Sequence, residues 1–180
     1  SEPLPEMRKI PVLQGDHAVA REEDVVLTTV LGSCIAVCLV DPARRIGGMN
    51  HFLLGEPVHA AAAQDALQRY GIHAMEVLIN ALMAHGAERG RLRAHLYGGA
   101  NIVRGLGRIG SANANFARSF LEMEGITISY EDVGGSTARR VEFVPVQGRS
   151  RCFHVAHAPE ERPMAAFPAG QHVGELELFR

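Results

Sequence analysis

The apolar positions of the first third of the chain form three short runs, at residues 25–30, 34–40 and 46–53. Each run is rich in β-branched residues and too short for an ordinary helix, which predicts three strands. A turn at residues 41–44 (DPAR) separates the last two runs. Aspartate can bond its own backbone there and proline presets φ, so the pattern predicts a β-hairpin.

The middle of the chain carries a helical period instead. Residues 72–85 place one apolar face inward and end before Gly86, a residue suited to a helix C-terminus. That face consists of Met75, Leu78, Ile79, Leu82 and Met83. A second helix is predicted over 113–124, capped by Ser111 or Asn113. The alanine-rich residues 55–71 fit a loop or a short helix.

Further strands are predicted at residues 92–97 and 126–130, with a hairpin of 141–146 and 151–156 and one short strand within 10–19 around Gln14. Strands outnumber helices and run in hairpins, which predicts an α+β fold with two main helices on a mixed or largely antiparallel sheet system. Residues 10–156 are predicted to form a single catalytic domain. Residues 1–9 are expected to be flexible, and residues 157–180 to be a mobile or partner-docking tail.

Composition narrows the class of protein. A chain of 180 residues with 47% hydrophobic residues suits one globular domain. The net charge of −2 gives no electrostatic reason to expect nucleic acid or an anionic membrane as a partner. Three cysteines suggest reduced thiols in a cytoplasmic protein, and neither a signal peptide nor a membrane span is visible.

The first hairpin carries the candidate chemistry. Cys34 follows a Leu-Gly-Ser turn, and His51 lies on the return strand. If Pro42 and Ala43 form the tip, Cys34 pairs with His51, and opposed Cβ atoms lie roughly 4.5–5.5 Å apart. A thiol beside an imidazole is the arrangement of a cysteine nucleophile and its base. A register slip of one residue would separate them, and a buried cysteine that only packs is the alternative.

Neighbouring residues could complete the site. Backbone N–H groups around Gly32, Ser33 and Cys34 could hold an oxyanion. Asn50 could donate a further hydrogen bond or be purely structural. Thr28 and Thr29 lie on opposite faces of their strand, and the residues alone do not choose between them.

Two other patterns are weaker. The sequence G-x-G-x-x-G at 105–110 resembles a dinucleotide loop, but it does not directly follow a predicted strand. Cys152, His154 and His157 could suggest a metal, although only the first two share a strand face. We therefore expect neither a cofactor nor a metal ion.

Several short segments of the sequence resemble the family of chemoreceptor glutamine deamidases, CheD. They are LTTVLGSCIAVCLVD, IGGMNHFLL, YGGAN (97–101), IGSAN (109–113) and EDVGGSTARRVEF (131–143), within about residues 10–155. The resemblance implies a layered sandwich and a catalytic triad of Cys34, His51 and Thr28. It also implies methyl-accepting chemotaxis receptors as substrates and, for some members, binding to the CheC phosphatase.

The function expected from the sequence is hydrolysis of glutamine side chains through a Cys34 thioester. A non-catalytic adaptor that binds receptor helices or CheC is the alternative from another class. A cysteine peptidase or a transglutaminase-like enzyme is a further enzymatic alternative. Neither the target glutamines nor the oligomeric state follows from the sequence.

Overall fold

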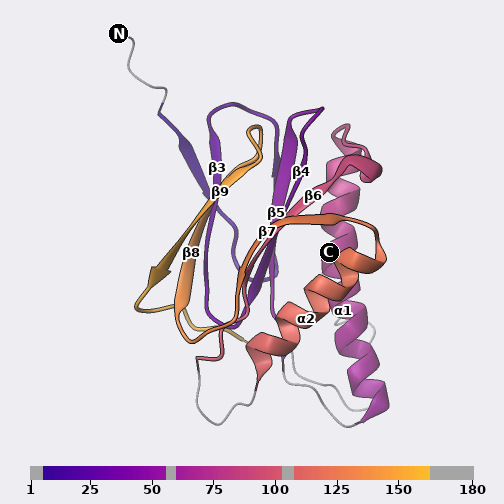
Figure 1. Ribbon diagram of the computed structural model, residues 1–180, viewed down its shortest axis with the longest axis vertical. Coiled ribbons are helices and arrows are strands. Elements are labelled where there is room, and N and C mark those ends of the chain that lie inside the picture. Colours follow the sequence, from indigo (N-terminus) through magenta and orange to yellow (C-terminus); the bar gives the residue numbers. More distant parts are fainter. Residues whose placement is uncertain (1–5, 56–59, 103–107, 163–180) are drawn as a thin grey trace.

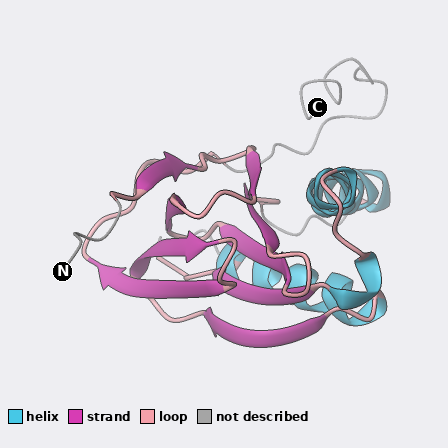
Figure 2. Ribbon diagram, turned by 90° about the horizontal axis from the view of Figure 1, so that it is seen from above, coloured by secondary structure: helices cyan, strands magenta, loops and turns pink. Residues whose placement is uncertain are grey.

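The computed structural model describes residues 6–55, 60–102 and 108–162, and it has three layers (Figure 1). A four-stranded sheet packs on one face of a five-stranded sheet, and two long helices cover the other face of the larger sheet. Figure 2 shows both helices on one side of the strands. The predicted α+β layered sandwich is therefore confirmed. Residues 1–5 of the expected flexible N-terminus and residues 163–180 of the expected tail lie outside the described ranges.

The smaller sheet has the order β1-β3-β8-β9, and the larger one the order β2-β5-β4-β6-β7. Neighbours are antiparallel except in the pairs β1–β3 and β6–β7, which are parallel. The strands of the smaller sheet are β1 (Arg8–Pro11), β3 (Val25–Leu31), β8 (Ala138–Val144) and β9 (Arg149–Val155). Those of the larger sheet are β2 (His17–Ala20), β4 (Ile35–Asp41), β5 (Ile46–Phe52), β6 (Arg93–Gly98) and β7 (Thr127–Val133). The helices are α1 (Ala61–Ala84), α2 (Ile109–Met123) and the short 3-10 helix η1 (Arg89–Arg91).

The strands β4 and β5 are buried at every position because layers cover both of their faces. Side chains alternate along a strand, so Ile35, Val37 and Leu39 pack toward the helices. The intervening residues, together with Cys34 just before the strand, pack toward the smaller sheet. The predicted nucleophile therefore lies at the end of the core between the two sheets.

The register of the first hairpin differs from the prediction by two residues. His51 pairs with Ala36, whereas the expected partner was Cys34. The reason is a longer turn: Asp41 pairs with Ile46, and Arg45 adopts a positive φ of 55°. A shift of two keeps the parity of a strand, so Cys34 and His51 still face the same side.

Several predicted elements have different bounds, the two long helices and the first strand among them. Helix α1 begins at Ala61, because the alanine-rich segment continues the helix and buries Leu67 and Tyr70. Helix α2 begins at Ile109 after Arg108, so neither predicted residue caps it. Residues 10–19 hold parts of two strands, with a turn at residues 14 and 15 between them. Met83, assigned to the buried face of α1, is 44% exposed.

Asp41 ties the first hairpin to η1. Its side chain is fully buried, and its two oxygens accept hydrogen bonds from the Arg91 guanidinium at 3.0 and 3.1 Å. The carboxylate also accepts the N–H groups of Ala43, Arg44 and Glu88. Burial by itself raises the pKa of Asp41, but the hydrogen bonds from Arg91, Glu88 and Arg44 outweigh it and lower the pKa to about 2.

Asp41→Asn should lower the free energy of unfolding at pH 7 by about 2–3 kcal/mol, because it removes the charge that Arg91 pairs with. A carboxyl whose pKa is depressed on folding stabilises above its unfolded pKa and loses that contribution as pH falls. Urea unfolding between pH 4 and pH 2 should therefore show a steeper loss of stability in the wild type than in the variant. Parallel pH profiles for the two proteins would contradict this role.

Candidate active site

In the turn between β3 and β4, residues 32–34, all three backbone carbonyl groups accept hydrogen bonds. The donors come from two distant segments, the residues that follow β6 and the first turns of α2. The bonds are Ala100 N–H to Gly32 O at 3.1 Å, the Asn113 side-chain amide to Ser33 O at 3.0 Å, and Gly99 N–H to Cys34 O at 2.8 Å. The turn is therefore held in one orientation by residues of the YGGAN and IGSAN segments.

The N–H groups of Gly32, Ser33 and Cys34 all bind one carboxylate, and we call these three groups the amide nest. The carboxylate belongs to Glu161 near the C-terminus. One oxygen, Oε2, accepts from Gly32 at 2.9 Å and from Cys34 at 3.0 Å. The other, Oε1, accepts from the Ser33 N–H at 2.6 Å and the Ser33 hydroxyl at 2.8 Å. Successive N–H groups in a turn form an anion-binding concavity, and this one binds a carboxylate.

Three reactive groups meet in front of the amide nest. The Cys34 Sγ, one ring nitrogen of His51 and one Glu161 oxygen all lie within 4.8 Å of one another. Cys34 is fully buried, and His51 is 6% exposed. The predicted pair of sulfur and imidazole is therefore brought together, not by direct strand pairing but across the end of the hairpin.

The hydrogen bonds of His51 define its tautomer. Its Nδ1 lies 2.8 Å from Thr29 Oγ1 and 3.1 Å from the Val12 carbonyl. The Thr29 hydroxyl donates to the Val12 carbonyl at 2.7 Å. The single hydroxyl proton of Thr29 is therefore already donated, and Thr29 Oγ1 can only accept from His51. Nδ1 must then carry the hydrogen of this bond. Nε2 is then the unprotonated nitrogen, and among the described residues this buried atom has no hydrogen-bond partner.

The threonine that contacts the imidazole is Thr29, not Thr28. The side chains alternate along β3, and Thr29 faces the core between the sheets. Thr28 points to the outer face, where its pairing partner is Glu142. The expectation that Thr28 orients His51 is therefore corrected to its neighbour, a choice that the residues alone had left open.

Asn50 is also displaced from its expected role. It follows the same alternation and points away from His51, toward α1. Its Oδ1 accepts the Val37 N–H at 3.0 Å, and its amide contacts the Ala74 carbonyl and the Met75 sulfur. Asn50 is a structural residue between β4, β5 and the helix, and it donates nothing to the site.

Asn113 is a site residue that the sequence analysis missed. The sequence pattern suggests it as a helix cap, but it is a fully buried residue inside α2. Besides its bond to Ser33, its Oδ1 accepts the Leu54 N–H at 3.0 Å. The useful signal was an asparagine at an inward position of an amphipathic helix, because a buried amide needs partners for both of its ends.

The paired glycines before His51 have a packing role. The register of β5 is continuous with both neighbours, so they form no bulge. A Cβ on Gly48 would lie 2.7 Å from the Ala18 carbonyl and 2.9 Å from Leu78 of α1. A Cβ on Gly47 would lie 3.0 Å from Pro145. Both glycines allow neighbouring layers to approach the strand.

The electrostatics describe a neutral pair at rest. Burial raises the pKa of the Cys34 thiol, and the nearby Glu161 carboxylate raises it further. Burial lowers the pKa of His51, although its hydrogen bond with Val12 and the charge of Glu161 act in the opposite direction. The thiol is therefore protonated and the imidazole uncharged at neutral pH, which is the starting state for general-base activation.

Cys34, His51 and Glu161 also have the residue types of a metal site. Both Glu161 oxygens already accept two hydrogen bonds each, so the carboxylate is bound by donors rather than oriented toward a cation. The suggested ligand His154 instead contacts Thr137 and Asp132. The loop at residues 103–107, within the dinucleotide-like pattern, lies outside the described residues.

Comparison with known proteins is specific. A family model described as "CheD chemotactic sensory transduction" matches residues 53–153. A Zymomonas mobilis protein named "Probable chemoreceptor glutamine deamidase CheD" is 57% identical over 156 residues, which cover 86% of this chain and 85% of the relative. The chain belongs to the CheD family.

A second CheD protein, from Caulobacter sp. strain K31, carries the same name and is 49% identical over 95% of this chain and 93% of its own. Among solved structures, a Neisseria meningitidis protein of the DUF152 family matches with a TM-score of 0.43 and 14% identity, over 73% of this chain and 64% of that one. That TM-score is too low to relate the two folds in detail. The resemblance that the sequence words suggested is thus confirmed by relatives that span most of the chain.

Thr29→Ala should lower kcat on a glutamine substrate by about ten- to a hundredfold, because it leaves the buried Nδ1–H of His51 without its nearest acceptor. Thr28→Ala is the matched control, since it removes the same atoms from the adjacent position on the outer face. Steady-state ammonia release by both variants checks the assignment. Equal losses, or a larger loss for Thr28→Ala, would reverse it.

Proposed function

We propose that this CheD-family protein hydrolyses the side-chain amide of selected glutamines in methyl-accepting chemotaxis receptors and leaves glutamates. One observation carries the proposal: the Cys34 sulfur and a ring nitrogen of His51 converge on a carboxylate bound by the amide nest. A carboxylate is the product of glutamine hydrolysis. The names of the CheD relatives support the receptor as the substrate.

The first half of the reaction forms a thioester. Nε2 of His51 takes the Cys34 proton as the sulfur attacks the carboxamide carbon. The oxygen becomes negative in the tetrahedral intermediate, and the N–H groups of Gly32 and Cys34 stabilise it because they already converge on one oxygen position. His51 then passes the proton to the nitrogen, the C–N bond breaks and ammonia leaves.

The second half regenerates the thiol. A water molecule attacks the thioester carbon while Nε2 accepts one of its protons. The S–C bond breaks and the proton returns to sulfur. The new carboxylic acid loses its own proton to solvent, and the resulting carboxylate remains in the amide nest. Thr29 keeps the imidazole in the tautomer that both halves require. The net change is consumption of one water and release of one ammonia.

The geometry favours a catalytic role over an adaptor. An adaptor would not require a buried base beside a thiol, or three N–H groups that converge on a carboxylate. No helix in the described part of the chain is long and apolar enough to cross a membrane. CheC as a partner and a cytoplasmic location stay predictions.

Cys34→Ala and His51→Ala should each abolish conversion of a receptor fragment, because the first removes the nucleophile and the second removes its base. Mass spectrometry of the fragment measures the gain of about one dalton per converted glutamine, and ammonia release gives the rate. Peptide cleavage products or amine adducts would instead indicate a peptidase or a transglutaminase. Full activity of Cys34→Ala would end the proposal.

The pH dependence should follow His51. Burial lowers its pKa, so the imidazole stays an uncharged base somewhat below its ordinary value of about 6.5. The acid limb of kcat/KM should therefore have its midpoint below about pH 6.5, with activity rising as pH increases through it. A midpoint clearly above that value would contradict the assignment of the buried imidazole as the base.

A further inference from the structure

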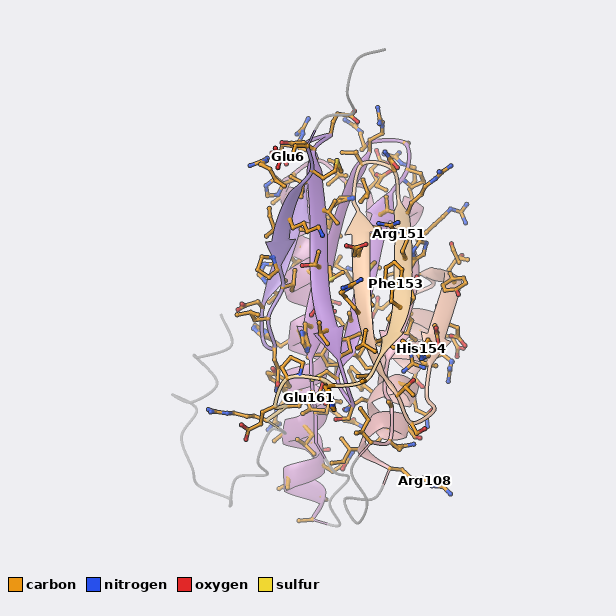
Figure 3. The ribbon with its side chains drawn as sticks, turned by 90° about the vertical axis from the view of Figure 1, so that its left-hand side faces the viewer. Glu6, Arg108, Arg151, Phe153, His154 and Glu161 are labelled. Carbon is orange, nitrogen blue, oxygen red and sulfur yellow. The ribbon has the colours of Figure 1, made fainter. Side chains whose placement is uncertain are left out.

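The group in the amide nest belongs to this chain. Glu161 lies 127 residues beyond Cys34 and fills the place where the proposed function puts the substrate side chain. Figure 3 shows Glu161 on the segment that leaves β9 and crosses the lower end of the smaller sheet. This segment also forms one wall of a pocket whose other walls include Ser33, Asn101, Gly110 and Ser136. The segment therefore lies where a substrate chain would have to approach.

The backbone after Glu161 is held as well. The Gln14 side chain donates to the Arg162 carbonyl at 2.6 Å and accepts the Arg162 N–H at 3.1 Å. This pair of bonds, which we call the Gln14 clamp, contacts only the backbone and is independent of the side chain of the bound residue. Gln14 lies in the turn between β1 and β2, and the next residue, Gly15, donates its N–H to the His51 carbonyl at 2.8 Å. The Gln14 clamp is thus built next to the candidate catalytic histidine.

From these contacts we propose that Glu161 and Arg162 occupy the substrate subsite as an internal mimic of the reaction product. The amide nest takes the side chain of the target residue, and Gln14 takes the backbone of the residue that follows it. The ligand class is a peptide segment with a glutamine, or its product glutamate, directly before the clamped residue. This inference deepens the proposed function and rests on it for its catalytic consequences.

The hydrogen bonds explain why the bound mimic is an acid. A carboxylate accepts all four donors, two on each oxygen. A carboxamide can place its oxygen on the Gly32 and Cys34 N–H groups and its NH₂ against the Ser33 hydroxyl, which can accept. The Ser33 N–H then faces a donor and loses its partner. The nest therefore holds glutamate with one more bond than glutamine, and Glu161 competes with incoming substrate.

The mimic also keeps the nucleophile inactive. The Glu161 carboxylate raises the pKa of Cys34 beyond the effect of burial, and one of its oxygens lies within 4.8 Å of the sulfur. Burial alone would raise the pKa of Glu161, but hydrogen bonds from Cys34, Gly32 and Ser33 lower it, so the charge persists. A receptor segment that displaces Glu161 removes this negative charge from beside the thiol at the same moment that it delivers the amide.

The inference makes a direct test possible, because Glu161→Gln converts the mimic into a substrate within the same chain. Cys34 should attack the carboxamide carbon introduced at position 161, release ammonia, and yield glutamate there after water cleaves the thioester. Purified Glu161→Gln protein should therefore carry glutamate at position 161, a gain of about one dalton over the encoded residue. The double variant Cys34→Ala/Glu161→Gln should retain its introduced glutamine. Glu160→Gln, one position earlier, should also retain it.

The outcomes separate this inference from the proposed function. If receptor fragments are deamidated but the glutamine of Glu161→Gln stays unconverted, the mimic is wrong and the enzyme assignment stands. Conversion in Glu160→Gln as readily as in Glu161→Gln would contradict the assigned position. Added to Glu161→Gln, the change Gln14→Ala should slow the self-conversion, and alone it should raise KM for receptor fragments more than it changes kcat. An unchanged rate and KM would remove Gln14 from the subsite.

A second measurement does not depend on turnover. Glu161→Ala should speed alkylation of Cys34 by iodoacetamide by about threefold or more, because the thiol is uncovered and its pKa falls. Glu160→Ala is the matched control, and Cys152 on β9 is the internal reference thiol. The same Glu161→Ala protein should deamidate receptor fragments with kcat/KM raised about threefold or more. Unchanged alkylation in Glu161→Ala would overturn the inference even if no receptor activity were found.

Discussion

The site depends on the direction in which the peptide groups of residues 32–34 point. A trans peptide places its C=O and its N–H on opposite sides of the chain. The Gly32 and Ser33 carbonyls accept hydrogen bonds from Ala100 and Asn113. The N–H groups of Ser33 and Cys34 therefore point to the opposite side, toward Glu161. The same bonds place Cys34 immediately before β4, with its side chain on the same side as His51. One set of contacts thus fixes both the proposed nucleophile and the N–H groups that we propose serve it.

Glycines allow those contacts to form. Gly98 has a φ of +108°, and a Cβ there would overlap the Cys34 carbonyl. A Cβ on Gly110, in the first turn of α2, would overlap the backbone of Gly99 and Ala100 in the same way. The buried Arg139 adds a further brace, since its guanidinium donates to the Gly98 carbonyl and pairs with Asp132 at 3.0 Å. The CheD-like segments distant from Cys34 therefore act mainly by binding the carbonyl groups of the turn at residues 32–34.

Sequence patterns predicted the α+β class, and the family resemblance implied the layers. The patterns also predicted the meeting of Cys34 with His51, and this prediction holds because face parity survives a register error of two residues. They could not decide between Thr28 and Thr29. The alternation of side chains along a strand shows only that Thr28 and Thr29 point to opposite faces. Which of them lies near His51 depends on which face of β3 the larger sheet covers. No sequence pattern pointed to Glu161, because a charged residue in a polar segment has no period and its contacts span more than a hundred positions. Only the tertiary structure brings such a residue to the nest.

An amide-hydrolysing site built in this way has an inherent conflict. The donors that we propose stabilise the negative oxygen of the intermediate also bind a carboxylate, and the product is a carboxylate. Because Ser33 contributes both its N–H and its hydroxyl, the resting site binds a carboxylate in preference to a carboxamide. An enzyme of this kind must release its product against that preference, and a glutamate of its own chain can fill the site between turnovers. A residue that competes for the nest would both help to displace the product and keep the buried thiol protonated, so the same donors would serve catalysis and its restraint.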